Sequence, residues 1–83
     1  MMDEDKLARY LRIGMEIADI TPQELSYTTE LPIRTIYNCR LKHNRQRCSR
    51  GVWSLVFHAL EEWAPGTQSK LAALDRAETE DNT

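Results

Sequence analysis

Four side chains between positions 34 and 41 combine positive charge, hydrogen-bonding groups and apolar surface on one predicted helix face: Arg34, Tyr37, Asn38 and Leu41. Residues three and four positions apart are neighbours on the surface of an α-helix. Arginine binds guanine and asparagine binds adenine through paired hydrogen bonds, and apolar atoms meet the methyl group of thymine. These residue types indicate a helix that reads base edges in the major groove, and a solvated helix face is the alternative.

The positive charge of the chain is concentrated around this helix. The formal net charge is −2, but residues 31–60 carry six basic and no acidic side chains, whereas residues 1–30 and 61–83 are each net −4. Exposed charges more than ~10 Å apart are largely screened at ~0.1 M salt, so a polyanion responds to the local patch. The residues that we expect to contact phosphate are Arg40, Lys42, Arg45, Arg47 and Arg50. A solvated basic loop is the alternative.

Other chemistry has less support in the sequence. A zinc site could draw on Cys39, His43, Cys48 and His58, but their spacings match no familiar zinc pattern. Cys39 falls on an apolar stripe, which favours a buried thiol. The chain has no recognisable nucleophile motif and no glycine-rich phosphate loop. We therefore expect no metal, no cofactor and no catalysis.

The clearest signal of local structure is Thr21-Pro22-Gln23-Glu24. Threonine followed by glutamate three residues later is a capping box, and proline suits the first helical position. A short helix therefore begins at Pro22, and it must end before Pro32, because proline disfavours a helical conformation in the residue before it. Pro32 suits the first turn of a third helix that runs to about Leu41. Residues 42–48 are predicted to form a polar loop.

Residues 21–41 resemble the helix-turn-helix of the phage repressor and Cro family. The resemblance rests on the run Gln23–Ser26, on Leu31 after the turn, and on Thr35-Ile36. It covers about 20 residues closely, and about 60 with the flanking helices. Two positions depart from the pattern, because Glu30 stands where the family usually has a turn glycine and Pro32 stands where it usually has a polar cap.

The resemblance implies an all-α, lambda-repressor-like fold of four to five helices that binds double-stranded DNA. In that family the N-terminal part of the second motif helix contacts bases, which favours Arg34, Tyr37 and Asn38. With Ile36 turned inward together with Cys39, Ile33 lies between the core and the groove. The N-terminus of the first motif helix touches phosphate, and Thr21 and Gln23 occupy that place here.

Two amphipathic helices flank the motif. Residues 4–18 place a set of apolar side chains on one face, namely Leu7, Ala8, Leu11, Met15 and Ala18. Gly14 costs this helix up to ~1 kcal/mol relative to alanine, so we expect a close packing contact there. Residues 49–63 carry an apolar stripe formed by Val52, Leu55, Val56, Ala59, Leu60 and Trp63.

A second, aromatic pair on the fourth helix, Trp53 and Phe57, lies beside that stripe. One stripe suffices for a core, so we expect this pair, with Trp63, to form a homodimer interface. A twofold dimer would hold two reading helices about one turn of DNA apart, ~34 Å, which matches a palindromic operator. Burial of the whole helix under the first helix is the alternative.

The sequence predicts one domain at residues 1–66 and an acidic, partly disordered tail at 67–83, with a short helix around Ser69–Arg76 and disorder from Glu78 onward. No stretch reaches the ~18 apolar residues that a membrane span needs. The first residues are acidic, unlike a signal peptide, and two unpaired cysteines suit a reducing compartment, so we expect a cytoplasmic protein.

Two classes of function follow. The first is a sequence-specific transcriptional regulator, a dimeric phage- or plasmid-type repressor or activator. The second is a small interaction or inhibitor protein on the same fold that binds a protein or ribonucleoprotein partner.

Overall fold

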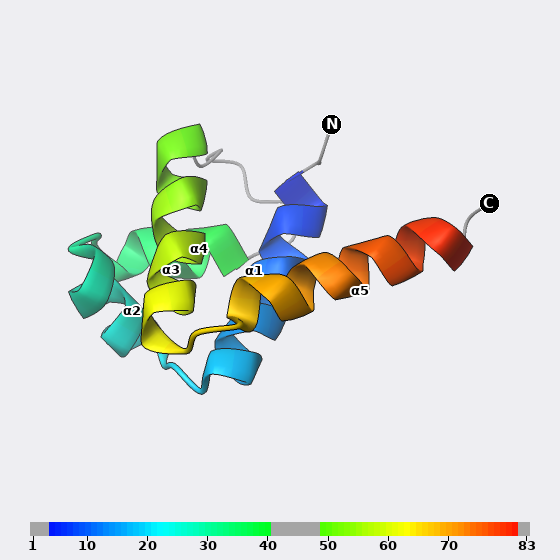
Figure 1. Cartoon of the computed structure of the whole chain (residues 1–83). Helices are drawn as coiled ribbons and strands as arrows, with labels where there is room; N and C mark the ends of the chain where they lie inside the picture. Colours follow the sequence, from blue (N-terminus) through cyan, green and yellow to red (C-terminus); the bar gives the residue numbers. More distant parts are fainter. Residues whose placement is uncertain (1–3, 41–48, 82–83) are drawn as a thin grey trace.

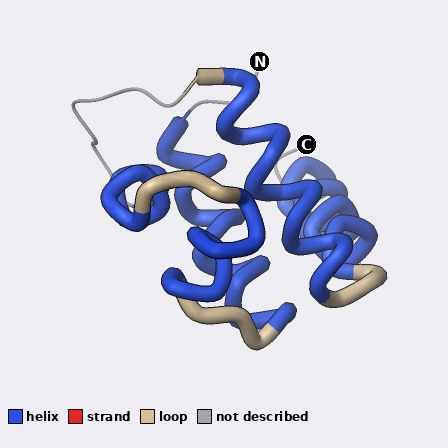
Figure 2. The backbone as a smooth tube through the Cα atoms, turned by 90° about the vertical axis from the view of Figure 1, so that its left-hand side faces the viewer, coloured by secondary structure: helices blue, strands red, loops and turns tan. Residues whose placement is uncertain are grey.

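The computed structural model describes residues 4–40 and 49–81, and these residues form five α-helices and no strand. The helices are α1 (Glu4–Ala18), α2 (Pro22–Thr29), α3 (Ile33–Arg40), α4 (Arg50–Trp63) and α5 (Thr67–Asp81). This confirms the predicted all-α fold of four to five helices. Figure 1 shows α2 at one end of the molecule and the C-terminal part of α5 at the other, and Figure 2 shows helices crossing at steep angles. None of the described helices is long and apolar enough to cross a membrane.

Helix α1 lies at the centre and packs against α3, α4 and α5. Its predicted apolar face is buried, since Ala8, Leu11, Met15 and Ala18 are each at most 6% exposed. The close contact expected at Gly14 is confirmed. A Cβ atom added there would lie 2.9 Å from Cδ1 of Leu60 in α4.

A left-handed residue ends α1. Asp19 has φ 54°, its N–H donates to the carbonyl of Glu16, and the N–H of Ile20 donates to the carbonyl of Met15. These two bonds form a Schellman motif, which satisfies carbonyls that the helix end leaves without partners. Ile20 is buried and immediately precedes the cap of α2. The chain therefore turns from α1 into α2 within three residues.

Helix α2 begins with the predicted capping box. Thr21 Oγ1 accepts from the N–H of Glu24 at 3.1 Å, and the Glu24 carboxylate accepts from the N–H of Thr21 at 3.0 Å. Ile20 and Leu25, on either side of the cap, are both buried, as a hydrophobic staple requires. The N-terminal end of α2 is thereby fixed relative to the core.

Helix α4 buries part of the predicted stripe, namely Val56, Ala59 and Leu60, together with residues outside it. Its N-cap is Ser49, and its buried side includes Trp53, which is 8% exposed, whereas Leu55 of the predicted stripe is 40% exposed. Phe57 packs against the same core with its ring 6.2 Å from that of Trp53. The prediction that Trp53 is exposed at a dimer interface is therefore wrong. Helices α1, α2 and α5 surround α4, so its buried face is wider than one stripe.

The C-terminal segment is more ordered than the sequence predicts, because α5 extends from Thr67 to Asp81. The Glu61 carboxylate accepts from the backbone N–H groups of Gly66 and Gln68 at 2.8 and 2.9 Å. These bonds, that of Gly66 first, lower the pKa of Glu61, and they cap the start of α5 from α4. The helix continues beyond Arg76, where the sequence predicts its end, as far as Asp81.

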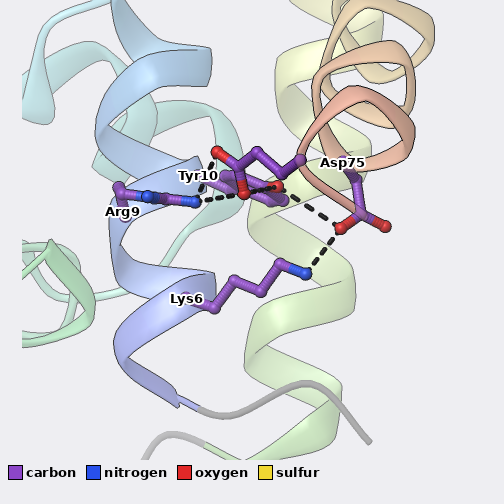
Figure 3. Close-up of polar contacts among 5 residues, drawn as sticks. Lys6, Arg9, Tyr10 and Asp75 are labelled. Carbon is purple, nitrogen blue, oxygen red and sulfur yellow. Dashed lines mark hydrogen bonds and ion pairs between the residues drawn. The ribbon is translucent and has the colours of Figure 1, made fainter. Parts of the chain in front are cut away.

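A polar cluster between α1 and α5 explains the extra length of α5 (Figure 3). Lys6 Nζ lies 2.5 Å from the Asp75 carboxylate, and Arg9 Nη2 lies 2.5 Å from that of Glu78. Tyr10 is 4% exposed, and its hydroxyl donates to Glu78 at 2.9 Å. Exposed ion pairs contribute little individually, but a shared buried phenol joins these into one network. Helix α5 therefore packs with α1 and α4.

Replacing Gly14 or Gly51 with alanine is expected to change the free energy of unfolding in opposite directions. At Gly14 the added Cβ would lie 2.9 Å from Leu60 and 3.2 Å from Leu71. Overpacking costs about 1–3 kcal/mol, which exceeds the helix-propensity gain of up to ~1 kcal/mol. At Gly51 the nearest atom would be Ser49 Oγ at 3.8 Å, so propensity acts alone. Urea denaturation measures both, and a Gly14→Ala protein more stable than wild type would contradict the packing.

Acid is expected to weaken the attachment of α5. The hydrogen bond from Lys6 lowers the pKa of Asp75, and that from Tyr10 lowers the pKa of Glu78. Such carboxylates stabilise the fold above their unfolded pKa of about 4, and this contribution is lost as pH falls through the folded value. Glu78→Gln should therefore destabilise the protein at about pH 7 and have a smaller effect at about pH 3.

Glu16→Gln is the matched control, because Glu16 is an exposed carboxylate on α1. Urea unfolding at the two pH values measures both variants. An effect of Glu78→Gln that is the same at both pH values would show that the carboxylate does not stabilise α5.

Candidate functional site

The turn between α2 and α3 is held by hydroxyl groups. Glu30, which stands where the family usually has a glycine, has φ 60° and adopts the left-handed conformation. The Ser26 hydroxyl donates to the carbonyl of Leu31 at 2.5 Å. Thr29 Oγ1 donates to the carbonyl of Leu25 at 2.7 Å and accepts from the N–H of Leu31 at 3.3 Å. These bonds fix the angle at which α3 leaves α2 despite the strain at Glu30.

The inner face of α3 is buried in the core. Ile36 is 0% exposed and Cys39 is 1% exposed, as predicted, and both belong to one buried cluster with Leu25. The helix spans Ile33–Arg40, and its first bonds run from the N–H groups of Thr35 and Ile36 to the carbonyl of Pro32. Rotation of α3 about its axis would expose Ile36, so its outer face is fixed.

That outer face presents a cation, an aromatic ring and an aliphatic side chain. Arg34 is exposed, Tyr37 is 45% exposed and Ile33 is 38% exposed. Ile33, which the sequence left between core and groove, therefore lies on the accessible side. Asn38 is half-buried and has an interaction within the protein, so it is less accessible than Arg34 and Tyr37. Leu41 lies outside the described residues.

Arg40 is more involved in the structure than the sequence suggests. Its guanidinium carbon lies 5.9 Å from the centre of the Tyr37 ring, and its Nε is buried. Its carbonyl accepts a hydrogen bond from Arg12 of α1. A guanidinium at the C-terminal end of a helix also interacts favourably with the helix dipole. Arg12 was missed because α1 carries three basic and three acidic side chains, and nothing in their spacing indicates the distant carbonyl that Arg12 binds.

The exposed side of α2 carries three candidate contacts. Thr21 and Gln23 are both exposed at the N-terminus of α2, as predicted, and Thr21 also forms the cap. Tyr27, which sequence reasoning missed, is 87% exposed. It lines a surface groove together with Ser26, Thr28, Glu30, Leu31 and Pro32. Helical spacing alone could have placed Tyr27 opposite the buried Thr29 and Leu25.

The remaining predicted residues are distributed over the molecule. Arg50 is exposed in the first turn of α4, whereas Lys42, Arg45 and Arg47 lie outside the described residues. Of the predicted dimer contacts, Trp63 is 43% exposed, Phe57 is half-buried and Trp53 belongs to the core. The candidate site therefore consists of the outer face of α3 and the exposed side of α2.

The residues considered for zinc are not assembled within the described chain, where no group of three histidine, cysteine or acidic residues is close enough to hold a metal ion. Cys39 is buried on the inner face of α3, and His58 lies 3.0 Å from Glu62 on α4. His43 and Cys48 are outside the described residues.

Comparison with known proteins identifies no relative: no family model matches the chain, and the curated proteins and solved structures give no significant match. The function of the protein is therefore inferred from the geometry of α2 and α3.

Replacing Glu30 with glycine is expected to increase stability by about 0.5–1 kcal/mol, because a left-handed conformation costs other residues more than glycine loses in chain entropy. Thr28→Gly is the matched control, since Thr28 is exposed on the helical part of α2. This change should lower the free energy of unfolding by up to ~1 kcal/mol. Urea denaturation measures both variants. Equal losses at the two positions would show that Glu30 is not strained.

Proposed function

We propose that the protein is a sequence-specific DNA-binding transcriptional regulator that acts in the cytoplasm. The observation that carries the proposal is the outer face of α3, where Arg34 and Tyr37 are exposed while Ile36 and Cys39 lock the opposite face into the core. A short helix held rigidly from behind, with arginine near its start, suits insertion into the major groove.

Docking of α3 in this way would bring the N-terminus of α2 toward the DNA backbone. Free N–H groups and the helix dipole favour an anion at that position, and Thr21 and Gln23 are exposed there. The hydroxyl of Tyr27, on the same helix, is a further candidate donor to phosphate. These contacts would orient the protein without reading sequence.

The cations that we propose as phosphate contacts differ in their exposure and in their contacts within the protein. Arg50 is exposed and remains a candidate, as do Lys42, Arg45 and Arg47. Arg40 is half-buried and lies against Tyr37, so we propose that it supports the outer face of α3 in addition to any phosphate contact.

A homodimer on a palindromic operator remains part of the proposal, on a narrower basis. Trp63, at the C-terminal end of α4, and Leu55 are exposed by 43% and 40%. Exposed large apolar side chains often mark interfaces, but Trp53 is buried in the core and cannot contribute. Trp63 is therefore the proposed contact of a twofold dimer.

One observation favours the second class, an interaction protein. Tyr27 is 87% exposed beside a groove that contains Pro32 and the acidic Glu30. Tyrosine is enriched at protein–protein interfaces, and a carboxylate beside the turn disfavours close approach of phosphate. A protein or ribonucleoprotein partner would use this side of α2.

Selection from a pool of random DNA duplexes, followed by gel-shift titration at two salt concentrations, tests the proposal. We expect enrichment of a site with inverted symmetry and an affinity that falls steeply with salt, because contacts to phosphate release counterions. Binding should survive excess competitor DNA. Failure to retain any DNA at low salt would exclude the first class and leave the interaction protein.

Arg34→Ala is expected to relax preference at one base position, by roughly 1–3 kcal/mol. Lys42→Ala should weaken binding to all sequences alike, because phosphate contacts carry no sequence information. Arg76→Ala is the matched control, since Arg76 is exposed on α5 at the opposite end of the molecule from α2 (Figure 1). Equal effects of Arg34→Ala on selected and random DNA would contradict its role as a reader.

A further inference from the structure

Two of the six exposed large hydrophobic side chains among the described residues lie on the outer face of α3. Ile33 and Tyr37 are 38% and 45% exposed, and they lie one helical turn apart with Arg34 beside them on the same face. A single exposed hydrophobic residue is ordinary on a soluble protein. An aliphatic and an aromatic side chain flanking an exposed arginine on one short helix form a composite surface with two kinds of chemistry.

Neither Ile33 nor Tyr37 belongs to the buried core cluster. Ile36 and Cys39 fill the inner face at 0% and 1% exposure, whereas Ile33 and Tyr37 remain accessible. Isoleucine is also a less favourable helix former than arginine, lysine or glutamine. Neither the core nor helix stability therefore explains an isoleucine at the exposed start of α3.

We infer, on the basis of the proposed DNA-binding function, that Ile33 and Tyr37 contact thymine methyl groups beside a guanine that Arg34 binds. The C5-methyl group of thymine is the apolar group that a base pair presents in the major groove. Arginine fits guanine through its O6 and N7 atoms. The inference assigns each of the three side chains to the base chemistry that it complements.

The spacing on the helix limits the DNA sequence. Side chains four residues apart have Cβ atoms about 5–6 Å apart, and successive bases on one strand are about 3.4 Å apart. The two methyl groups therefore lie within about two base-pair steps of each other. Arg34 lies between the two contacts in sequence, so its guanine belongs to the same short element.

Tyr37 is held in place for this contact. The guanidinium of Arg40 lies 5.9 Å from the centre of its ring, and the carbonyl of Arg40 is bound by Arg12 from α1. A ring that is already positioned loses less conformational freedom on binding. Tyr37 is thus a contact residue that Arg40 and Arg12 position.

The test begins with the DNA site selected by the wild-type protein. Each thymine of one half-site is replaced singly by deoxyuridine, which removes the methyl group and leaves every hydrogen bond of the base pair. We expect affinity to fall about fourfold at one or two positions adjacent to a guanine, the value of one buried methyl group. The dependence of affinity on salt should not change, because no phosphate contact is lost.

Protein variants assign each methyl contact to a residue. The Ile33→Ala variant should bind the thymine site more weakly than the wild-type protein does. Its affinities for the thymine site and for the matching deoxyuridine site should be equal. Tyr37→Ala should do the same at the other position. Leu55→Ala is the matched control, because Leu55 is an exposed aliphatic residue on α4, and it should keep the full preference for thymine. Circular dichroism confirms that each variant is folded.

The outcomes separate this inference from the proposed function. Selection of a DNA site that tolerates deoxyuridine at every position would overturn the methyl contacts and leave the DNA-binding function intact. A thymine preference that persists in both Ile33→Ala and Tyr37→Ala would overturn the assignment to these residues. Failure to select any site would overturn the proposed function and, with it, the inference.

Discussion

The fold depends on the close approach of α1 to α4 and α5 at Gly14. Without a Cβ atom there, Leu60 and Leu71 lie against the backbone of α1, and Thr67 at the start of α5 lies beside them. A protein of this size has a small core, so one interhelical contact of this kind carries a large share of its packing. On the N-terminal side of this contact, α1 holds two other helices. The polar cluster around Tyr10 holds α5, and Arg12 holds the end of α3.

The presentation of α3 follows from constraints at both of its ends. At its start, the hydroxyls of Ser26 and Thr29 stabilise a turn whose left-handed residue is glutamate. At its end, Arg12 binds the carbonyl of Arg40. Because Ile36 anchors the middle, α3 has little freedom to rotate or tilt. Rigid support of this kind is what an interface that reads chemical groups at fixed spacing requires.

Local signals in the sequence predicted local structure well, but they did not predict features that depend on contacts between residues distant in the sequence. The capping box at Thr21 and the packing role of Gly14 were predictable, because each depends on neighbours in the chain or on the cost of glycine in a helix. The burial of Trp53 was not predictable, since it depends on three helices surrounding α4. Likewise, the helical conformation around Glu78 depends on partners 68 and 69 positions away in sequence.

Charge placement reconciles an acidic protein with a basic surface. In the described residues, Asp75 and Glu78 are turned toward Lys6 and Arg9, so cations of α1 pair with carboxylates of α5 and each neutralises the other. These pairs involve the C-terminal half of α5, which runs away from α2 (Figure 1). Carboxylates that are paired with cations add little field at a distance, and screening at physiological salt acts over ~8 Å. The net charge of −2 is therefore a poor guide to what the outer face of α3 attracts, and the distribution of charge along the fold is the better one.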